Sequence, residues 1–260
     1  MYEGVDRTVK QFYADLMDVR VYDDRNQMGA AAGADIKACI LEMLKTKDTL
    51  NMIFAAAPSQ NEVLASLAKD PEIPWNRVQA FHMDEYIGLS PDAPQGFGNF
   101  LRNALFGLAP FGKVNYIDCA ATDAQAECDR YSKLLRENPV DIVVMGIGEN
   151  GHIAFNDPPV ADFQDPQLVK IVALDPICRQ QQVNDGCFKA LEDVPTHALT
   201  LTVPALMAAK RHFCIVPAPT KAKAVEATVR GAIGEHCPAT CLRKKENSIL
   251  YLDPDSAALL

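Results

Sequence analysis

Residues 141–157 read DIVVMGIGENGHIAFND, and an α/β architecture follows most directly from them. The apolar run Ile142–Met145 is typical of a buried strand. Three glycines in the next six residues let the backbone turn sharply and approach a ligand closely. His152 and Asp157 follow, and open α/β sheets build their sites at the carboxyl ends of strands. The segment therefore predicts a functional site, with a tight turn capped by a histidine as the alternative.

A second candidate strand ends in two adjacent acids. Residues 78–89 read VQAFHMDEYIGL, in which Asp84 and Glu85 follow an apolar run and Gly88 closes the segment. Two carboxylates at the tip of a buried strand are costly unless they are solvated or paired, so the pattern indicates a cleft. The alternative is that both acids face water beyond the end of the strand.

Strands and helices alternate along the rest of the chain. Strands are predicted at 17–23, 51–57, 78–84, 114–117, 141–146, 168–174, 198–203, 212–217 and 248–252, and helices at 29–46, 62–68, 96–106, 123–136, 178–189 and 220–230. Alternation without a linker favours an α/β fold with a single domain over residues 1–260. Such a fold is a mainly parallel, doubly wound, Rossmann-like sheet with helices on both faces.

Composition narrows the class of protein. A formal net charge of -9 with no basic tract disfavours nucleic acid as a partner. The sequence contains no run of about eighteen apolar residues, so we expect no membrane span. Met1–Arg7 lacks the apolar core of a signal peptide. Eight cysteines without a CxxC pair indicate reduced thiols, and Cys237 and Cys241 lack the companion histidine of a zinc finger. We therefore expect a cytoplasmic protein with no membrane partner and no metal site.

Four strings carry a resemblance to a known family. They are FHMDEYIGL at 81–89, GIGENGHIAFNDP at 146–158, PTHALTLT at 195–202 and KAKA at 221–224. Over nearly its whole length the chain resembles the glucosamine-6-phosphate deaminase/isomerase family, and GHIAFN separates this group from the related 6-phosphogluconolactonases. The resemblance implies an enzyme of amino-sugar metabolism that needs no metal and no organic cofactor. It also implies a lid around residues 158–190, for which an ordinary surface loop is the alternative.

The implied reaction converts glucosamine 6-phosphate and water into fructose 6-phosphate and ammonia, by ring opening and proton transfer from C2 to C1. Ring opening needs a group that both donates and accepts a proton near neutral pH, and similarity assigns it to His152. Asp157, where the family usually carries Glu, and Asn150, where many members carry Asp, are expected to orient that ring. The transfer needs a carboxylate that reaches both carbons, and similarity assigns it to Asp84.

The phosphate-binding loop is where the sequence departs from the family. The family carries a Gly-Gly-Thr loop after its first strand, whereas residues 56–62 read AAPSQNE here. Ser59 keeps a hydroxyl, but Ser59 and Glu62 also match a capping box, which would bring a carboxylate to the same positive helix end. Lys221 matches a family lysine that pairs with the phosphate. Arg179 is the nearest substitute for a family arginine that is missing here.

The candidate binding residues are therefore Ala57, Ser59, Gly148, Lys221, Glu85 and Arg179. Glu85 is more readily structural than catalytic, and isolated histidines such as His82 are expected to be packed or surface residues. Three functions stay open: a hexosamine-6-phosphate deaminase acting on the glucosamine or the galactosamine epimer, a 6-phosphogluconolactonase, and a non-catalytic protein that binds a sugar phosphate. The first has a small amino-sugar phosphate as its partner, and the sequence leaves a homo-oligomer open.

Overall fold

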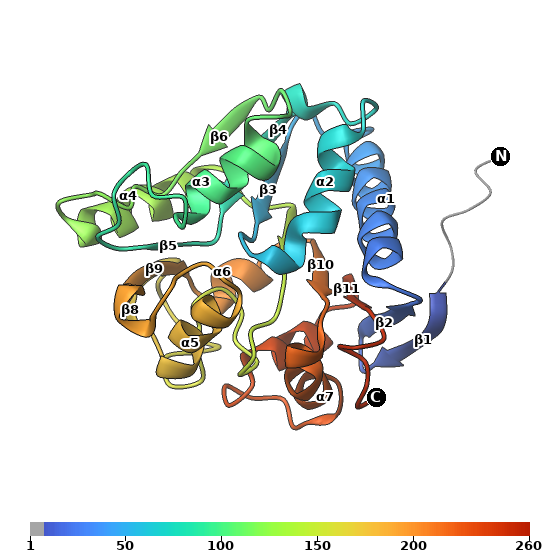
Figure 1. The fold of residues 1–260 in the computed structure, drawn as a ribbon. Helices are drawn as coiled ribbons and strands as arrows, with labels where there is room; N and C mark the ends of the chain where they lie inside the picture. The colour runs from blue at the N-terminus through green and yellow to red at the C-terminus, as the bar shows by residue number, and fades with distance from the viewer. Residues whose placement is uncertain (1–7) are drawn as a thin grey trace.

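The computed structural model describes residues 8–260, which form two sheets covered by helices (Figure 1). Within this range the larger sheet has eight strands, in the order β1 (Thr8–Ala14), β2 (Met17–Tyr22), β11 (Ser248–Leu252), β10 (Arg211–Val216), β7 (Ile142–Met145), β3 (Leu50–Phe54), β4 (Val78–His82) and β6 (Lys113–Asn115). β1 and β2 pair antiparallel, and the other neighbours in this sheet pair parallel. The expectation about a signal peptide concerns Met1–Arg7, which lie outside the described residues.

Helices cover both faces of the larger sheet. The first face packs against α1 (Arg25–Met43), α2 (Asn61–Lys69) and α3 (Phe97–Leu101), and the second against α4 (Ala124–Glu137), α6 (Val203–Met207) and α7 (Ala222–Arg230). In β7, Ile142 and Val144 belong to the first core, whereas Val143 and Met145 belong to the second. This division arises because successive side chains of a strand point to opposite faces. The predicted doubly wound α/β fold is confirmed.

A smaller antiparallel sheet, which the sequence does not predict, lies beside the larger one (Figure 1). Its order is β5 (Asp84–Tyr86), β9 (His197–Leu201) and β8 (Val169–Ala173), and α5 (Pro176–Asn184) follows β8. Only Met83 separates the end of β4 from β5, so one run of residues passes directly from the larger sheet to the smaller. The predicted strands at 168–174 and 198–203 exist, but apolar periodicity does not tell which sheet a strand joins.

Several elements differ from the prediction: β1 is not predicted, and α5 ends at Asn184 instead of residue 189. α1 begins at Arg25 instead of residue 29, because Asp24 caps it by accepting a hydrogen bond from the backbone N–H of Gln27. The helix predicted at 96–106 is α3 followed by a π-helical turn, Arg102–Phe106. All eight cysteines are free thiols. Between residues 8 and 260, no helix is both long enough and apolar enough to cross a membrane.

Candidate functional site

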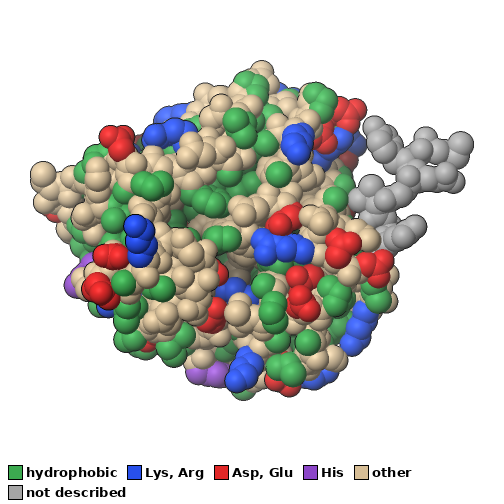
Figure 2. All heavy atoms as spheres, in the orientation of Figure 1, with side chains coloured by type: hydrophobic (Ala, Val, Ile, Leu, Met, Phe, Trp, Pro, Cys, Tyr) green, Lys and Arg blue, Asp and Glu red, His purple; other side chains and the backbone are tan. Residues whose placement is uncertain are grey.

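One cavity lies at the carboxyl ends of five strands of the larger sheet, where α/β folds present their loops. Its walls include Arg25 after β2, Ala57 after β3, Asp84 after β4, His152 after β7 and Lys221 after β10. Figure 2 shows this face of the molecule hollowed near its centre, with Lys or Arg side chains at the edge of the hollow. Asp84 and His152, which come from separate strand ends, therefore line the same cavity.

Asp84 is buried at the junction of the two sheets, with 7% of its surface exposed. Burial, together with the charge of the neighbouring Glu85, raises the pKa of the Asp84 carboxyl well above its ordinary range. A carboxyl group in this setting exchanges a proton nearer to neutral pH than an exposed aspartate does. A raised pKa is a property that suits a carboxylate to proton transfer near neutral pH.

His82 fixes the backbone at Asp84. The backbone N–H of Ile117 donates to His82 Nε2 at 2.8 Å, and His82 Nδ1 lies 2.9 Å from the backbone oxygen of Asp84. Because Nε2 accepts, the ring hydrogen is on Nδ1 and donates to that oxygen. Burial lowers the pKa of His82 to about 4, which keeps the ring neutral. His82 is thus a packed histidine, as the sequence predicts, and it anchors the chain beside the cavity.

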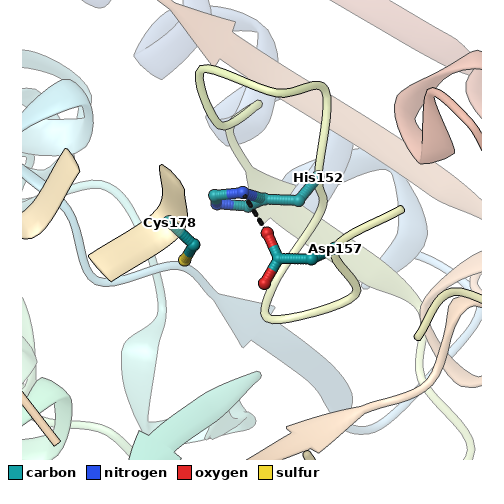
Figure 3. Close-up of side chains that lie close together, drawn as sticks. All are labelled: His152, Asp157 and Cys178. Atoms are coloured by element: carbon teal, nitrogen blue, oxygen red, sulfur yellow. Dashed lines mark ion pairs between the residues drawn. The ribbon is translucent and has the colours of Figure 1, made fainter. Parts of the chain in front are cut away.

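Asn150 and Asp157, both in the loop that follows β7, hold His152 on the Nδ1 side of its ring. Figure 3 shows the Asp157 carboxylate facing the ring. His152 Nδ1 lies 2.7 Å from Asn150 Oδ1 and 3.0 Å from Asp157 Oδ1, and Asn150 Nδ2 donates to Asp157 Oδ1 at 2.9 Å. Both neighbours of Nδ1 are acceptors, so Nδ1 carries the hydrogen. Within residues 8–260 no protein group bonds Nε2, which is free to exchange a proton with a ligand.

The carboxylate of Asp157 reaches the ring even though its side chain is shorter than the glutamate usual in the family. Burial raises the pKa of Asp157, but the hydrogen bond and charge of His152, together with the amide of Asn150, lower it by more. The net effect is a pKa below the ordinary value, so Asp157 is ionised at neutral pH. The charge of Asp157 therefore lies next to the Nδ1 side of the imidazole.

Two positions of the same loop require glycine, each for a different structural reason. A Cβ atom on Gly148 would lie 2.0–2.3 Å from three atoms of the His152 ring, so only glycine lets the ring lie against this backbone. Gly151 has φ +84°, a conformation that side chains disfavour. Gly148 lines the cavity, whereas the role of Gly151 is to turn the chain. The glycines of this motif thus serve ring placement as well as the turn.

Lys221 is a buried cation without a protein counter-ion. It is 5% exposed and, like Ala57 and Ser59, lines the cavity. Between residues 8 and 260, no hydrogen bond or ion pair engages its ammonium group. Burial lowers the pKa of Lys221, and the charges of Asp185 and Glu149 oppose that shift. A buried ammonium is costly unless an anion joins it, so this end of the cavity favours an anionic group.

Three expectations about charged residues need correction. Glu85 does not line the cavity, because its carboxylate accepts backbone N–H groups at the start of α3. Arg179 does not line it either, since its Nη2 donates to the backbone oxygens of Leu191 and Val194. The capping box of Ser59 and Glu62 is not formed: no side chain caps α2, and the Glu62 carboxylate pairs with a guanidinium instead.

The cavity also has lining residues that the sequence analysis missed. They are Arg25, Gln181, Gln182, Asp185 and Thr220, among others. Arg25 lies three residues beyond the end of β2. Because open α/β sheets build their sites at the carboxyl ends of strands, this position is a signal in the sequence for Arg25, as it is for Asp84 and His152. The glutamines and Asp185 come from the end of α5 and the residue after it, where polar residues carry no such signal.

Within the described chain, His152, Asp157 and Cys178 form one group with the donor types of a metal site. Their ligand atoms lie within 4.8 Å of one another (Figure 3). Two features oppose that use: His152 Nδ1 is bonded to Asn150, and burial raises the pKa of the Cys178 thiol well above its ordinary value. Metals bind the thiolate, so the cluster is better understood as the buried support of the imidazole.

Comparison with known proteins points in one direction. The family model of glucosamine-6-phosphate isomerases/6-phosphogluconolactonase matches residues 23–251. The glucosamine-6-phosphate deaminase of Listeria welshimeri is 33% identical over 229 residues, which are 88% of this chain and 96% of that protein. The glucosamine-6-phosphate deaminase of Bacillus thuringiensis is 35% identical over 220 residues, which are 85% of this chain and 82% of that protein.

Solved structures give the same picture of the fold. A monomeric glucosamine-6-phosphate deaminase superposes with a TM-score of 0.84 at 25% identity, covering 93% of this chain and 99% of that one. The 6-phosphogluconolactonase of Thermotoga maritima superposes with a TM-score of 0.73 at 21% identity, covering 90% of this chain and 98% of that one. The likeness to the lactonase concerns the fold alone.

Proposed function

The chain belongs to the family of glucosamine-6-phosphate isomerases and 6-phosphogluconolactonases, and from that premise we propose that Asp84 and His152 are the proton carriers of a glucosamine-6-phosphate deaminase. It is an enzyme of the deaminase kind, because curated relatives of that name share a third of its residues over most of both chains. The proposed reaction takes glucosamine 6-phosphate and water to fructose 6-phosphate and ammonia. The observation that carries the residue assignment is that Asp84 and His152 line one cavity.

His152 suits the ring-opening step. Opening the sugar removes the proton of the C1 hydroxyl and delivers a proton to the ring oxygen, so one group has to accept and then donate. His152 Nε2 is free for both, because Nδ1–H is held by Asn150 and Asp157. The negative charge of Asp157 favours the imidazolium that forms between the two transfers.

Asp84 suits the transfer between carbons. In the open sugar the C2 proton is acidic because C1 is an aldehyde. The Asp84 carboxylate takes this proton while O1 gains one, which leaves an enolamine. Asp84 then returns its proton to C1 while the nitrogen loses one, which gives an imine at C2, so that the net result also moves one proton from nitrogen to O1. Water then adds at C2 and ammonia leaves, so the atoms of the reaction balance. A carboxyl with a raised pKa is the stronger base for the first of these steps.

The phosphate is proposed to lie at Lys221, beside the turn that contains Ala57 and Ser59. The burial of Lys221 without a counter-ion supports this position. Gly148 lines the same cavity, and its lack of a side chain lets the His152 ring lie against the backbone there. This arrangement sets the reacting carbons of the substrate toward Asp84 and His152 while the phosphate anchors its other end.

Residues 158–190 are proposed to act as a lid within a single domain. From this segment, Gln181, Gln182 and Asp185 line the cavity. The side-chain oxygen of Gln181 accepts the backbone N–H of Glu149 at 2.9 Å, so α5 is tied to the loop that carries His152. A shift of α5 would therefore act on the imidazole as well as on access to the cavity.

The proposal is tested by incubating the purified chain with glucosamine 6-phosphate and measuring ammonia and fructose 6-phosphate. Galactosamine 6-phosphate and 6-phosphogluconolactone are run in parallel, and binding of each is measured by calorimetry. We expect equal amounts of ammonia and fructose 6-phosphate from the glucosamine substrate. Ammonia from the galactosamine epimer alone would move the substrate to that sugar. Lactone hydrolysis alone, or binding without turnover of any compound, would contradict the proposed reaction.

A further inference from the structure

Arg25 is a second cation on the wall of the cavity, and the proposed chemistry gives it no task. It is the first residue of α1, and 35% of its side chain is exposed. Its Nε lies 2.7 Å from Glu62 Oε1, and its Nη2 donates to the backbone oxygen of Pro58. Arg25 and Pro58 both line the cavity. The guanidinium therefore contacts a turn that lines the same cavity as Lys221.

The charges around this end of the cavity favour a second cation for an anionic ligand. A phosphate monoester carries about two negative charges at neutral pH, and Lys221 balances one of them. A guanidinium offers parallel N–H groups that match two phosphate oxygens. Within residues 8–260 no protein acceptor bonds Arg25 Nη1, so one donor of the fork is available without breaking a contact.

We infer that Arg25 is the second cation for the phosphate of the substrate, and that Glu62 competes with that phosphate for the guanidinium. The inference rests on the proposed sugar-phosphate substrate. The backbone positions of both residues are fixed by helices, because Arg25 is the first residue of α1 and Glu62 lies in the first turn of α2. The two helices pack so closely that a Cβ on Gly29 would come within 2.3 Å of Glu62 Cβ. Glu62 thus lowers the affinity of Arg25 for an anion in the cavity.

A purely structural role is the competing explanation for the pair, since Arg25 and Glu62 also connect α1 to α2. The two explanations differ in the sign of one effect. Arg25→Gln and Glu62→Gln break the same ion pair, and Arg25→Gln also removes the hydrogen bond to Pro58, so a purely structural role predicts weaker phosphate binding in both variants. Only Arg25→Gln removes a phosphate ligand, whereas Glu62→Gln removes a competitor of the phosphate.

The experiment compares wild type, R25Q, R25K and E62Q. Calorimetry gives the Kd of inorganic phosphate, steady-state kinetics give kcat and KM for glucosamine 6-phosphate, and thermal unfolding checks the fold of each variant. We expect R25Q to weaken phosphate binding and raise KM by about tenfold, with kcat within about threefold of wild type. R25K should fall between R25Q and wild type, because it keeps the charge and loses the fork. E62Q should bind phosphate as tightly as wild type or more tightly.

An R25Q variant whose Kd for phosphate stays within about twofold of wild type would overturn the inference. Equal weakening in R25Q and E62Q would overturn it too, because that result is what a structural tie predicts. If R25Q does not fold, the comparison of R25K with E62Q decides in the same way. Absence of turnover in the wild type would contradict the proposed function but not the role of Arg25. The titration measures the contribution of Arg25 to the Kd of inorganic phosphate, and that measurement does not depend on catalysis.

Discussion

Asp84 and Glu85 are adjacent acids with different surroundings, and strand geometry explains the difference. Successive side chains of β5 point to opposite sides, so Asp84 lines the cavity and Glu85 faces α3. Glu85 accepts the backbone N–H groups of Phe97 at 3.0 Å and of Gly98 at 2.8 Å. Burial raises the pKa of both acids, but these backbone donors oppose the shift of Glu85. Asp84 alone keeps its carboxylate available to a ligand in the cavity.

Asp157→Asn tests the charge beneath His152. The pKa of Asp157 is lowered from 3.8 in the folded chain, so its charge stabilises the fold above pH 3.8 and that contribution is lost as pH falls through the folded pKa. We expect D157N to lower the free energy of unfolding by about 1–3 kcal/mol at pH 7, measured by urea titration with D92N at an exposed site as control. The difference in the free energy of unfolding between D157N and wild type should become smaller below about pH 4. A difference that stays constant to that pH and below would contradict the assigned charge.

Gly148→Ala tests whether the position of the imidazole matters for turnover. The added Cβ would lie within 2.3 Å of the His152 ring, so the ring has to move. A displacement of about 1 Å in a reacting group costs roughly 100-fold in rate. We therefore expect kcat to fall by about that factor, and thermal unfolding checks that the variant stays folded. Retention of wild-type kcat in G148A would show that ring opening does not depend on this placement of His152.

At the scale of elements, the loops after the parallel strands are held by neighbouring strand ends. The loop after β10 contains Ala218 at φ +85° and ψ +149°, a region that is essentially reserved for glycine. Asp253, directly after β11, accepts the backbone N–H of Ala218 at 3.0 Å and that of Ser256 at 2.8 Å. These bonds hold a strained residue three positions before Lys221. The strain is thus part of how the loop presents its cation to the cavity.

Ala218→Gly is expected to relieve this strain. Glycine adopts positive φ without a Cβ clash, so the free energy of unfolding should rise by about 1 kcal/mol. Chemical denaturation of A218G beside wild type measures it. A218G should also raise KM for the sugar phosphate, because a relaxed loop holds Lys221 less firmly. A variant that is clearly less stable than wild type would contradict the reading of Ala218 as strained.

At the scale of the whole molecule, the sequence predicts the large sheet well and the small one poorly. Buried parallel strands such as Ile142–Met145 are continuous apolar runs, and their helices have apolar faces, so local pattern is sufficient. In the antiparallel sheet, β5 pairs with β9 across more than a hundred positions and β8 pairs with β9 across 24 to 32 positions, and a local pattern encodes neither pairing. The late start that the pattern predicts for α1 has a different cause: the cap at Asp24 is a local signal, which apolar periodicity alone does not use.

The candidate site shows the same division. Asp84 and His152 follow strand ends and belong to long motifs, so the sequence identifies both. Arg179 was expected near the phosphate from its place in the chain, but its guanidinium is used by backbone oxygens. Arg25 is far from every motif, and only the fold brings it to the cavity that Lys221 also lines. In a chain with a net charge of -9, two cations in one cavity are a feature that the order of residues in the sequence does not reveal.

Asp84→Asn is the most direct test of the account, because the proposed chemistry depends on this one carboxylate. The amide keeps the size of the side chain and cannot take the C2 proton, so we predict that kcat for glucosamine 6-phosphate falls by about 10²- to 10⁴-fold. The Kd of the substrate should stay within a few fold of wild type, and D92N, an exposed Asp→Asn control, should match wild type throughout. Turnover by D84N within a few fold of wild type, with the fold intact, would contradict the claim that Asp84 moves the proton.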